Sequence, residues 1–271
     1  MPRLGVLGWP VAHSRSPAIH NAALAHLKMD GWRYQRLPVP PELFEQTTRG
    51  LAGSGFVGAN VTIPHKEAAL ALADSASEAA RAIGAANTLN LDSEGAIFAE
   101  NTDAPGLIAA LDRSPRGSRA MVLGAGGSAR ACAWALREAG ASEVMVWNRT
   151  PERARALARQ LDIRAVDAPQ PADLLVNCTS VGLERSATER EALNQLGMAF
   201  DQVGEYSYVV DLVYRAGPTP LLVAAAQAGV PTLDGLEILV AQGALSFELW
   251  TGRAAPVEIM RRAARSGSAC A

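Results

Sequence analysis

The sequence predicts an α/β protein with two open α/β domains, each built on a mainly parallel sheet. Strand-like apolar runs alternate with helical runs along the chain, which is the pattern of parallel sheets covered by helices. A glycine-rich turn at 124–129 joins an apolar run to an alanine-rich helix, as in dinucleotide-binding domains. The loop Asp112–Ser118, rich in Ser, Pro, Arg and Gly, is the best domain boundary in the sequence. The length of 271 residues allows one large domain or two modest ones.

The first half begins with an apolar strand, and further strands and helices follow in alternation. The run Phe56–Val61 (FVGANV) has the apolar character of a buried parallel strand. Pro17 is predicted to be the first residue of a helix and Ser16 its N-cap. The other strands are predicted at Leu4–Leu7, Tyr34–Leu37 and in a hairpin of Thr88–Leu91 and Ala96–Ala99, and the helices at Pro17–Leu27, Pro41–Leu51, His65–Ala73 and Asp103–Leu111.

The second half starts with the strand Ala120–Leu123, and the helix after its glycine turn extends to Ala139, where Gly140 ends it. The segment Glu184–Asp201 is charged and poorly periodic, and no element is assigned to it. The remaining strands are predicted at Glu143–Trp147, Leu174–Asn177 and Val209–Val213, and the helices at Pro151–Leu161, Thr219–Ala228, Leu236–Trp250 and Val257–Arg265.

The composition is that of a globular protein without a strongly basic or acidic tract. The formal net charge is −2, so nucleic acid is not an expected partner. No apolar run reaches the ~20 residues of a membrane span, and the amino terminus has no signal-peptide pattern. Cys132, Cys178 and Cys270 are odd in number and far apart, as in reduced cytosolic proteins. We expect a cytoplasmic protein without a metal site, because the four histidines lack metal-ligand spacing.

Polar residues gather where the strand Phe56–Val61 ends. Asn60, Thr62 and Lys66 lie at the strand end, in the turn and at the start of the next helix. Open α/β sheets bind ligands at the carboxyl ends of parallel strands, so this cluster is a candidate site. Asp103 adds a carboxylate downstream, and a lysine beside a carboxylate is a candidate proton-transfer pair. Taken alone, Lys66 could equally be an exposed helix residue and Asp103 a helix cap.

The turn Gly124-Ala125-Gly126-Gly127-Ser128-Ala129 fits the G-x-G-x-x-G/A pattern, in which backbone approaches a pyrophosphate at a helix amino end. NAD sites usually place an acid roughly 20 positions further on, to bind the ribose 2′-hydroxyl. Here the next strand ends in Asn148-Arg149-Thr150, and the guanidinium of Arg149, with Arg153 one turn later, suits a 2′-phosphate. The residues therefore favour NADP(H), although Glu152 is an acid nearby and both arginines could be solvated surface charges.

Ser14 and Ser16 place two hydroxyls beside the amino end of the helix that Pro17 begins. Such an end attracts anions, so these serines are a candidate anion site. The alternative is that Ser16 only caps the helix.

Eight segments in the same order carry a resemblance to a known family. They are Gly8-Trp9-Pro10 with His13-Ser14-Arg15-Ser16-Pro17, Asn60-Val61-Thr62-Ile63-Pro64-His65-Lys66, Gly84-Ala85-Ala86-Asn87-Thr88, Asn101-Thr102-Asp103, the glycine turn, Asn148-Arg149-Thr150, Tyr214 within DLVY, and Asp234-Gly235 followed by Gln242. On these segments the chain resembles the shikimate dehydrogenases almost from end to end.

The resemblance implies a domain organisation that composition alone does not show. The last helices would pack back on the first domain, so that a discontinuous substrate-binding domain comprises residues 1–103 plus 237–271. A Rossmann-type NADP-binding domain would span residues 104–236. No segment of the sequence has the pattern of a subunit interface, so the sequence allows both a monomer and a homodimer.

The resemblance also implies a reaction and its substrate contacts. Ser14 and Ser16, helped by Tyr214, would bind the substrate carboxylate. The ring hydroxyls would be bound by polar residues from distant segments, namely Asn60, Thr62, Asn87, Asp103 and Gln242, and Lys66 would also contact the substrate. Lys66 and Asp103 would be the catalytic pair of the reversible, NADPH-dependent reduction of 3-dehydroshikimate to shikimate, a step of chorismate and aromatic amino-acid biosynthesis.

By the same resemblance Thr179, Leu212 and Gly235 would contact the cofactor, together with the glycine turn and the segment Asn148–Arg153. Ile238 stands where the family usually has methionine, and Leu183 is a similar apolar exchange.

Two rival functions remain. One is a dehydrogenase acting on quinate, or on both acids, with NAD; Ser16 and Arg149 argue against it. The other is a catalytically silent relative that binds the same ligands; it would typically lack Lys66 or Asp103, and this sequence has both.

Overall fold

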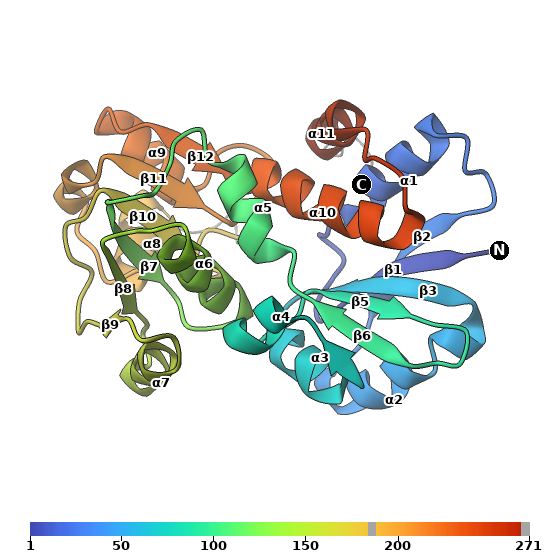
Figure 1. Cartoon of the computed structure of the whole chain (residues 1–271). Helices are drawn as coiled ribbons and strands as arrows, with labels where there is room; N and C mark the ends of the chain where they lie inside the picture. Colours follow the sequence, from blue (N-terminus) through green and yellow to red (C-terminus); the bar gives the residue numbers. More distant parts are fainter. Residues whose placement is uncertain (184–187, 267–271) are drawn as a thin grey trace. The chain divides into compact units, whose positions relative to one another are not determined.

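The computed structural model describes residues 1–183 and 188–266, which form two compact units (Figure 1). The first unit comprises Met1–Gly106 and the chain from Leu239 onward, and the second comprises Leu107–Ile238. The chain passes from one unit to the other inside two helices, α5 (Asp103–Ala110) and α10 (Gly235–Thr251).

The loop Asp112–Ser118, predicted as the boundary, lies inside the second unit, so this prediction is wrong. A boundary inside a continuous helix produces no shift in composition, and the polar loop serves only to connect α5 to the next strand.

The first unit contains a six-stranded mixed sheet. Its strands are β1 (Arg3–Gly8), β2 (Arg33–Pro38), β3 (Phe56–Val61), β4 (Ser75–Ala76), β5 (Thr88–Leu91) and β6 (Ile97–Glu100). Their order is β2-β1-β3-β5-β6-β4. β1 pairs parallel with β2 and β3, whereas β5 is antiparallel to β3 and β6. The predicted hairpin is therefore confirmed, and it extends the parallel part of the sheet.

Helices pack on both faces of this sheet, so β1 is buried from Leu4 to Gly8 and its alternate residues face opposite cores. They are α1 (Ser16–His26), α2 (Phe44–Arg49), α3 (Lys66–Leu72), α4 (Glu78–Ile83) and α11 (Val257–Ser266), with α10 and two short 3₁₀ turns (Pro41–Leu43 and Ala52–Ser54). Leu7 faces a core shared with Phe44 of α2 and Leu72 of α3. Leu4 and Val6 belong to a second core with Trp250 of α10. In Figure 1, α1 lies beside α11 and α10 on the side opposite α2 and α3.

The second unit contains six strands that are all parallel. They are β7 (Arg119–Leu123), β8 (Glu143–Trp147), β9 (Arg164–Ala165), β10 (Leu174–Asn177), β11 (Tyr208–Asp211) and β12 (Thr232–Asp234). Their order, β12-β11-β10-β7-β8-β9, reverses direction between β7 and β10. This is the doubly wound arrangement, in which a dinucleotide binds at the reversal, outside the carboxyl ends of the strands.

The helices of this unit cover both faces of the sheet. α6 (Gly127–Glu138) and α7 (Pro151–Leu161) pack on one face, and α8 (Glu189–Gln195) and α9 (Pro220–Gln227) pack on the other. A 3₁₀ turn, Asp201–Glu205, precedes β11. The α/β prediction is confirmed, but β4, β9, β12, α4 and α8 were not predicted, because elements this short show too little periodicity.

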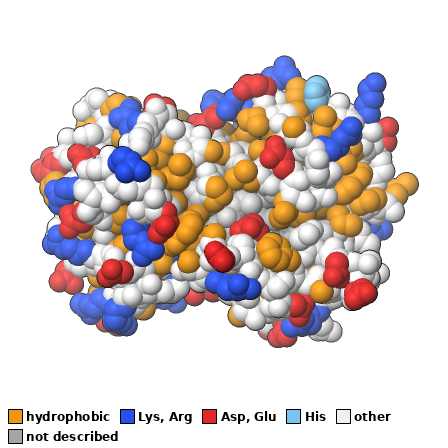
Figure 2. Space-filling view, in the orientation of Figure 1, with side chains coloured by type: hydrophobic (Ala, Val, Ile, Leu, Met, Phe, Trp, Pro, Cys, Tyr) orange, Lys and Arg blue, Asp and Glu red, His pale blue; other side chains and the backbone are white. Residues whose placement is uncertain are grey.

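α8 lies in the charged segment to which no element was assigned, and Thr188 and Glu191 form its capping box. Residues 184–187 of that segment and Cys270 lie outside the described residues. No described helix is both long and apolar enough to span a membrane. Within the described ranges there is also no group of His, Cys, Asp and Glu side chains suited to a metal ion. Figure 2 shows Lys, Arg, Asp and Glu side chains interspersed over the visible surface, without a large patch of one sign.

Asp211, at the end of β11, gives folding a specific pH dependence. Burial raises the pKa of this carboxyl from 3.8 to about 6, against the opposing hydrogen bonds and the charge of Arg215. Between these two pH values the folded protein therefore holds a proton that the unfolded chain releases. Linkage then requires the free energy of unfolding to rise as the pH falls through this window, by on the order of 1–3 kcal/mol.

Asp211→Asn should remove this contribution. Denaturant unfolding of both proteins from pH 7 to pH 4 measures it, since subtracting the two stabilities cancels the other titrating groups. We expect the stability of the original protein relative to Asp211→Asn to increase as the pH falls. A difference that stays constant over this range would contradict the assignment.

Candidate active site

Lys66 and Asp103 form an ion pair in the first unit, between the first residues of α3 and α5. Lys66 Nζ donates to Asp103 Oδ2 at 2.5 Å, and the two side chains are 10% and 13% exposed. Lys66 is therefore not an exposed helix residue. Asp103 is not the helix cap either, because it is the first residue of α5 and its carboxylate oxygens accept from Lys66 and Asn87. Lys66 is also one of only two lysines among the 25 Lys and Arg residues of the sequence, so nearly all other basic side chains are arginines.

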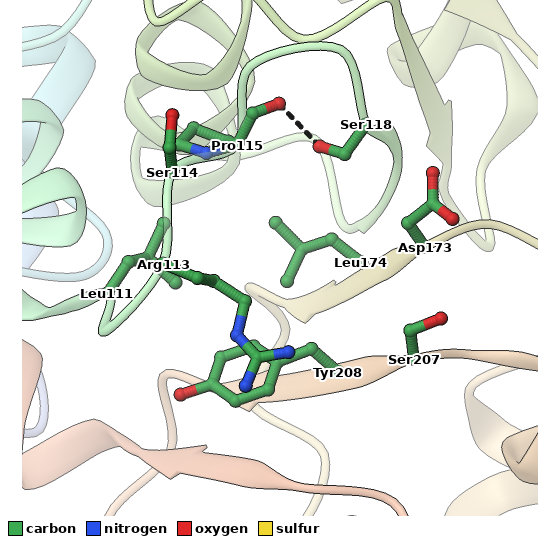
Figure 3. Close-up of a pocket in the computed structure, with 9 residues that line it drawn as sticks. All are labelled: Leu111, Arg113, Ser114, Pro115, Ser118, Asp173, Leu174, Ser207 and Tyr208. Carbon is green, nitrogen blue, oxygen red and sulfur yellow. Dashed lines mark hydrogen bonds between the residues drawn. The ribbon is translucent and has the colours of Figure 1, made fainter.

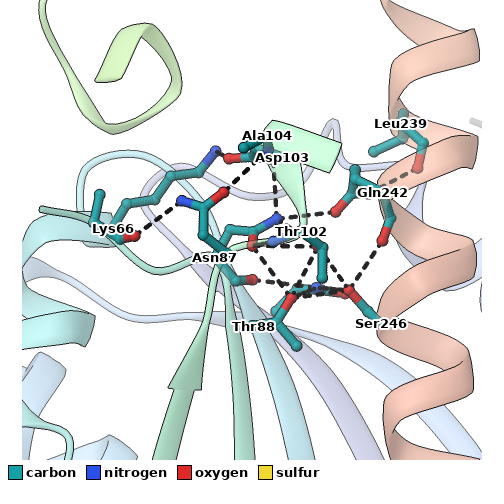
Figure 4. A network of polar contacts seen from close by, with 12 residues as sticks. Lys66, Asn87, Thr88, Thr102, Asp103, Ala104, Leu239, Gln242 and Ser246 are labelled. Atoms are coloured by element: carbon teal, nitrogen blue, oxygen red, sulfur yellow. Dashed lines mark hydrogen bonds and ion pairs between the residues drawn. The ribbon is translucent and has the colours of Figure 1, made fainter. Parts of the chain in front are cut away.

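Asn87, directly before β5, holds this pair in place. Its Nδ2 donates to Asp103 Oδ1 at 2.9 Å and lies 3.1 Å from Gln242 Oε1. Its Oδ1 accepts the backbone N–H of Thr102 at 2.7 Å, which identifies the oxygen because a backbone N–H can only donate. Both carboxylate oxygens of Asp103 thus have partners, and the predicted residues Lys66, Asn87, Asp103 and Gln242 form one contiguous group (Figure 4).

A cluster of three buried hydroxyl groups packs against Asn87 on the side of the sheet. Thr88, Thr102 and Ser246 lie within 2.9–3.1 Å of one another. Ser246 is one turn after Gln242 on α10, so the cluster links this helix to the sheet (Figure 4). Asn60, at the end of β3, joins it through Nδ2, which lies 3.0 Å from Ser246 Oγ and 3.1 Å from Thr88 Oγ1.

Asn60 is held on its other side by Tyr34 of β2. The Tyr34 hydroxyl donates to Asn60 Oδ1 at 2.7 Å. The ring of Tyr34 stacks on His20 with the centroids 4.3 Å apart, and burial lowers the pKa of His20 to about 3, so His20 is neutral. The protein thus provides acceptors for Asn60 Nδ2 and a donor for Oδ1, which fixes the orientation of this amide.

Gly106 allows α5 and α10 to approach closely beside Gln242. A Cβ at this position would lie 2.7 Å from Gln242 Cβ and 2.9 Å from its backbone N and Cα. Gly106→Ala should therefore push α10 away and displace Gln242. We expect the free energy of unfolding to fall by about 1–3 kcal/mol, and the KM for a ligand bound by Gln242 to rise.

Denaturant unfolding and steady-state kinetics measure the two effects. Gly31→Ala is the matched control, because a Cβ at Gly31 would meet nothing within 4 Å. Equal stabilities of the two variants would contradict the prediction, because they would show that a Cβ at position 106 fits between α5 and α10.

Ser14 is buried in the segment between β1 and α1, and Ser16 is buried as the first residue of α1. The structure corrects the prediction that Ser16 is the N-cap: Arg15 occupies this position, and Ser14 Oγ accepts the Ser16 N–H at 3.3 Å. Arg36 of β2 donates through Nε and Nη2 to the Ser14 carbonyl, at 3.1 and 2.8 Å. A fixed guanidinium thus accompanies the two serines, which favours an anion there.

Thr62 follows β3 and is half-buried. Its Cγ2 packs on Gly8 so closely that a Cβ on Gly8 would lie 2.4 Å from it. The Ser14–Ser16 segment follows β1 and the Asn60–Lys66 segment follows β3, which are parallel neighbours. The predicted substrate residues of this unit therefore come from the carboxyl ends of β1 and β3 and the elements that follow them, from the residue directly before β5, and from α5 and α10.

Sequence reasoning missed Tyr34, Arg36, Thr88, Thr102 and Ser246. Thr88 and Thr102 stand inside the segments that carry the resemblance, and Ser246 lies one helical turn from Gln242. Arg36 and Tyr34 gave no sequence signal, because only strand pairing brings β2 beside the other segments.

In the second unit, the glycine turn joins β7 to α6. Gly124 has a positive φ of 111°, a conformation that favours glycine. Gly126 is the N-cap of α6, and a Cβ there would meet nothing within 4 Å. There is thus free space beside the N-cap of this helix of 12 residues, and the amino end of a helix suits a pyrophosphate.

Arg149 and Arg153 are exposed beyond the end of β8, the neighbour of β7. Asn148 Nδ2 donates to the Thr150 carbonyl at 3.0 Å, which shapes the turn before α7. Glu152 lies 3.7 Å from Arg155, and neither Arg149 nor Arg153 has a carboxylate partner among the described residues. Two uncompensated guanidinium groups thus stand near the position where an NAD site carries an acid.

The other predicted residues of this unit follow β10, β11 and β12. Thr179 lies after β10, Leu212 and Tyr214 after β11, and Gly235 directly after β12. A Cβ at Gly235 would lie 2.3 Å from the Leu212 carbonyl oxygen, so these two segments are in close contact. Ile238 is buried in the core beneath them.

A small cavity of about 90 Å³ lies at the amino ends of the strands of this sheet, away from the residues named above (Figure 3). It is lined by Leu111, Arg113, Ser114, Pro115, Ser118, Asp173, Leu174, Ser207 and Tyr208. Arg113 stacks on the Tyr208 ring at 4.0 Å. The cavity lies beside the amino ends of β7, β10 and β11, whereas dinucleotides bind outside the carboxyl ends, so it is not the cofactor site.

Comparison with known proteins identifies the family. Residues 6–89 match the shikimate dehydrogenase substrate binding domain, residues 109–193 the shikimate / quinate 5-dehydrogenase domain, and residues 235–265 the shikimate 5′-dehydrogenase C-terminal domain. A relative from Thermus thermophilus, shikimate dehydrogenase (NADP(+)), is 46% identical over 98% of both chains. The chain belongs to the shikimate dehydrogenase family.

Solved structures agree with this family. Shikimate 5-dehydrogenase from another strain of Thermus thermophilus, in complex with NADP(H) and shikimate, superposes with a TM-score of 0.86. It is 44% identical, and the match covers 98% of this chain and 99% of that one. The ligand-free 5-ketofructose reductase of a Gluconobacter strain has a TM-score of 0.81, at 30% identity over 97% of both chains. The same fold therefore also occurs in a protein named for a different ketone.

Proposed function

We propose that this chain catalyses the reversible reduction of 3-dehydroshikimate to shikimate with NADPH, a step of chorismate and aromatic amino-acid biosynthesis. The observation that carries the proposal is the buried Lys66–Asp103 pair, joined by Asn87 to Gln242. A positioned lysine is the proton donor that reduction of a ketone requires. The names of the relatives that cover nearly the whole chain support this substrate and cofactor.

Lys66 and Asp103 have different roles in the proposed proton transfer. NADPH, when bound, supplies the hydride that converts the ring ketone to an alkoxide. The Lys66 ammonium stabilises this charge and donates a proton to the oxygen, and in the oxidation of shikimate its neutral amine accepts the proton. Asp103 orients the ammonium through its 2.5 Å contact, and only the ammonium of this pair carries N–H donors.

The substrate's other groups are matched by the remaining polar residues. We assign the carboxylate to Ser14, Ser16 and Tyr214, with Arg36 fixing the serine segment. Asn60, Thr62, Asn87 and Gln242 bind the ring hydroxyls. Buried amides of this kind discriminate strongly, because a ligand without the partner hydroxyl leaves them unpaired.

NADP fits the residues present in the second unit. The open amino end of α6 at Gly126 receives the pyrophosphate, and Arg149 and Arg153 bind the 2′-phosphate. Thr179, Leu212 and Gly235 complete the contacts at the ends of β10, β11 and β12. The second unit is thus the cofactor domain and the first unit the substrate domain.

The proposal also covers the location, the oligomeric state and the partners of the enzyme. It acts in the cytoplasm as a monomer or homodimer, with small molecules as its only partners. The near-neutral net charge of −2 supports the absence of a nucleic-acid partner.

The experiment that tests the function is a spectrophotometric assay of shikimate and of quinate, each with NADP⁺ and with NAD⁺. We expect turnover with shikimate and NADP⁺ to exceed the other three combinations. A preference for quinate or for NAD⁺ would support the first rival, and no turnover at all would support a silent binding protein. Reduction of 5-ketofructose in the same assay would indicate the activity named for the Gluconobacter neighbour.

A further inference from the structure

Asp211 and Asn177 are fully buried polar side chains at the ends of β11 and β10. The two residues are paired in register, and Asn177 Nδ2 donates to Asp211 Oδ1 at 2.9 Å. Neither has a role in the proposed reaction. A buried carboxylate is costly to desolvate, so its presence in this core needs an explanation beyond packing.

Asn177 controls the loop after β10. Its Oδ1 accepts both the backbone N–H and the hydroxyl of Thr179, at 3.0 and 2.7 Å. Thr179 Oγ1 in turn accepts the Val181 N–H at 3.1 Å. The start of this loop therefore has its backbone direction set by the Asn177 amide, and that amide is oriented by Asp211.

Asp211 itself controls the loop after β11 at both ends. Its Oδ1 also accepts the Val213 N–H at 3.0 Å, directly before Tyr214. Its Oδ2 accepts the Thr219 hydroxyl at 2.5 Å, and Thr219 is the N-cap of α9. An ionised carboxylate can only accept hydrogen bonds, which makes it suited to gather three donors from separate segments.

Both loops press against glycines of the cofactor site. A Cβ at Gly124 would lie 3.3 Å from the Cys178 backbone and 3.4 Å from Thr179 Cγ2. At Gly235 it would lie 2.3 Å from the Leu212 oxygen and 3.0 Å from the Asp211 oxygen. Because these segments are packed so closely, a shift of either loop would also move the backbone at Gly124 or Gly235, which belongs to the proposed cofactor site.

We propose that Asp211, acting with Asn177, is a positioning residue for the nicotinamide half of the NADP site. The inference rests on the proposed function, since it takes NADP as the ligand. Arg149 and Arg153, beyond β8, hold the adenosine half through its 2′-phosphate. A dinucleotide lies across the reversal of strand order, so its other half lies over the ends of β10, β11 and β12, where Asp211 acts.

The test compares two ligands that share the adenosine half. Titration calorimetry measures the binding of NADP⁺ and of adenosine 2′,5′-bisphosphate to the original protein, Asp211→Ala and Asp211→Asn. Asp211→Ala should weaken NADP⁺ binding about tenfold or more, the effect of removing hydrogen bonds to a charged group. Binding of the bisphosphate should change less than about twofold, because Asp211 does not act on the β8 end of the site. Asp211→Asn preserves the shape and two acceptor contacts, so it should restore part of the affinity and serves if the alanine variant fails to fold.

Tyr206→Phe is the matched control, since it removes a buried hydroxyl that donates to the Gln170 carbonyl at 3.1 Å, before the amino end of β11. It should leave both affinities unchanged. Equal losses for the two ligands, or no loss of NADP⁺ affinity in either Asp211 variant, would overturn the positioning role. If the original protein bound neither ligand, the proposed cofactor would be wrong and this inference with it.

Discussion

Lys66→Ala should lower kcat for shikimate oxidation with NADP⁺ by ~10²–10⁴-fold, the usual contribution of a positioned acid–base group. The reason is that this variant lacks the amine that takes up the proton from the hydroxyl undergoing oxidation. The affinity for NADP⁺ should stay the same, because the proposed cofactor contacts lie in the second unit. Steady-state kinetics and cofactor titration measure the two quantities separately.

Lys66→Arg distinguishes charge from proton transfer. A guanidinium preserves a positive charge opposite Asp103 but does not give up its proton at ordinary pH. We therefore expect this variant to remain strongly impaired, whereas Lys28→Arg, the same exchange at the second lysine of the chain, should be silent. An unchanged kcat in Lys66→Ala would remove Lys66 from the mechanism.

Arg149→Ala should raise the KM for NADP⁺ by roughly 10–100-fold, the value of charge-assisted hydrogen bonds to a phosphate. The KM for NAD⁺ should change little, because NAD⁺ lacks the 2′-phosphate. The preference for NADP⁺ over NAD⁺ would therefore fall by nearly the same factor. Kinetics with both cofactors at saturating shikimate measure this ratio.

Arg155→Ala is the control for a general loss of positive charge on α7. Arg155 is paired with Glu152 and Asp167, so it should contribute little to phosphate binding. Equal increases in KM for the two cofactors after Arg149→Ala would show that Arg149 does not recognise the 2′-phosphate.

Local sequence patterns were sufficient for the α/β class and for the cofactor turn. The signal of the turn is contained in a few consecutive residues, from β7 through Gly124 to the start of α6. The Lys66–Asp103 pair was also predicted, because both residues start helices at the ends of strands. Its burial, which excludes an exposed lysine, and the hydrogen bonds of Asp103, which exclude a capping role, required the structure.

Contacts between distant segments were not predictable from local patterns. Ser246 meets Thr102 across more than a hundred residues, and Tyr34 reaches Asn60 only because β2 and β3 flank β1. The assignment of Ser16 as N-cap failed for a different reason. The helix starts one residue earlier than predicted, so Arg15 occupies the N-cap position without a side-chain cap bond, and Ser14 accepts the Ser16 N–H.

The central claim is that hydride passes between a nicotinamide and the ring ketone while Lys66 supplies the proton. The most direct measurement is the reduction of 3-dehydroshikimate with (4R)- and (4S)-deuterated NADPH, with the products analysed by mass spectrometry and NMR. We expect one of the two cofactors to place a single deuterium on the carbon that carried the ketone, and the other to retain its deuterium in NADP⁺. Failure to form shikimate, or shikimate without deuterium from either cofactor, would contradict the account.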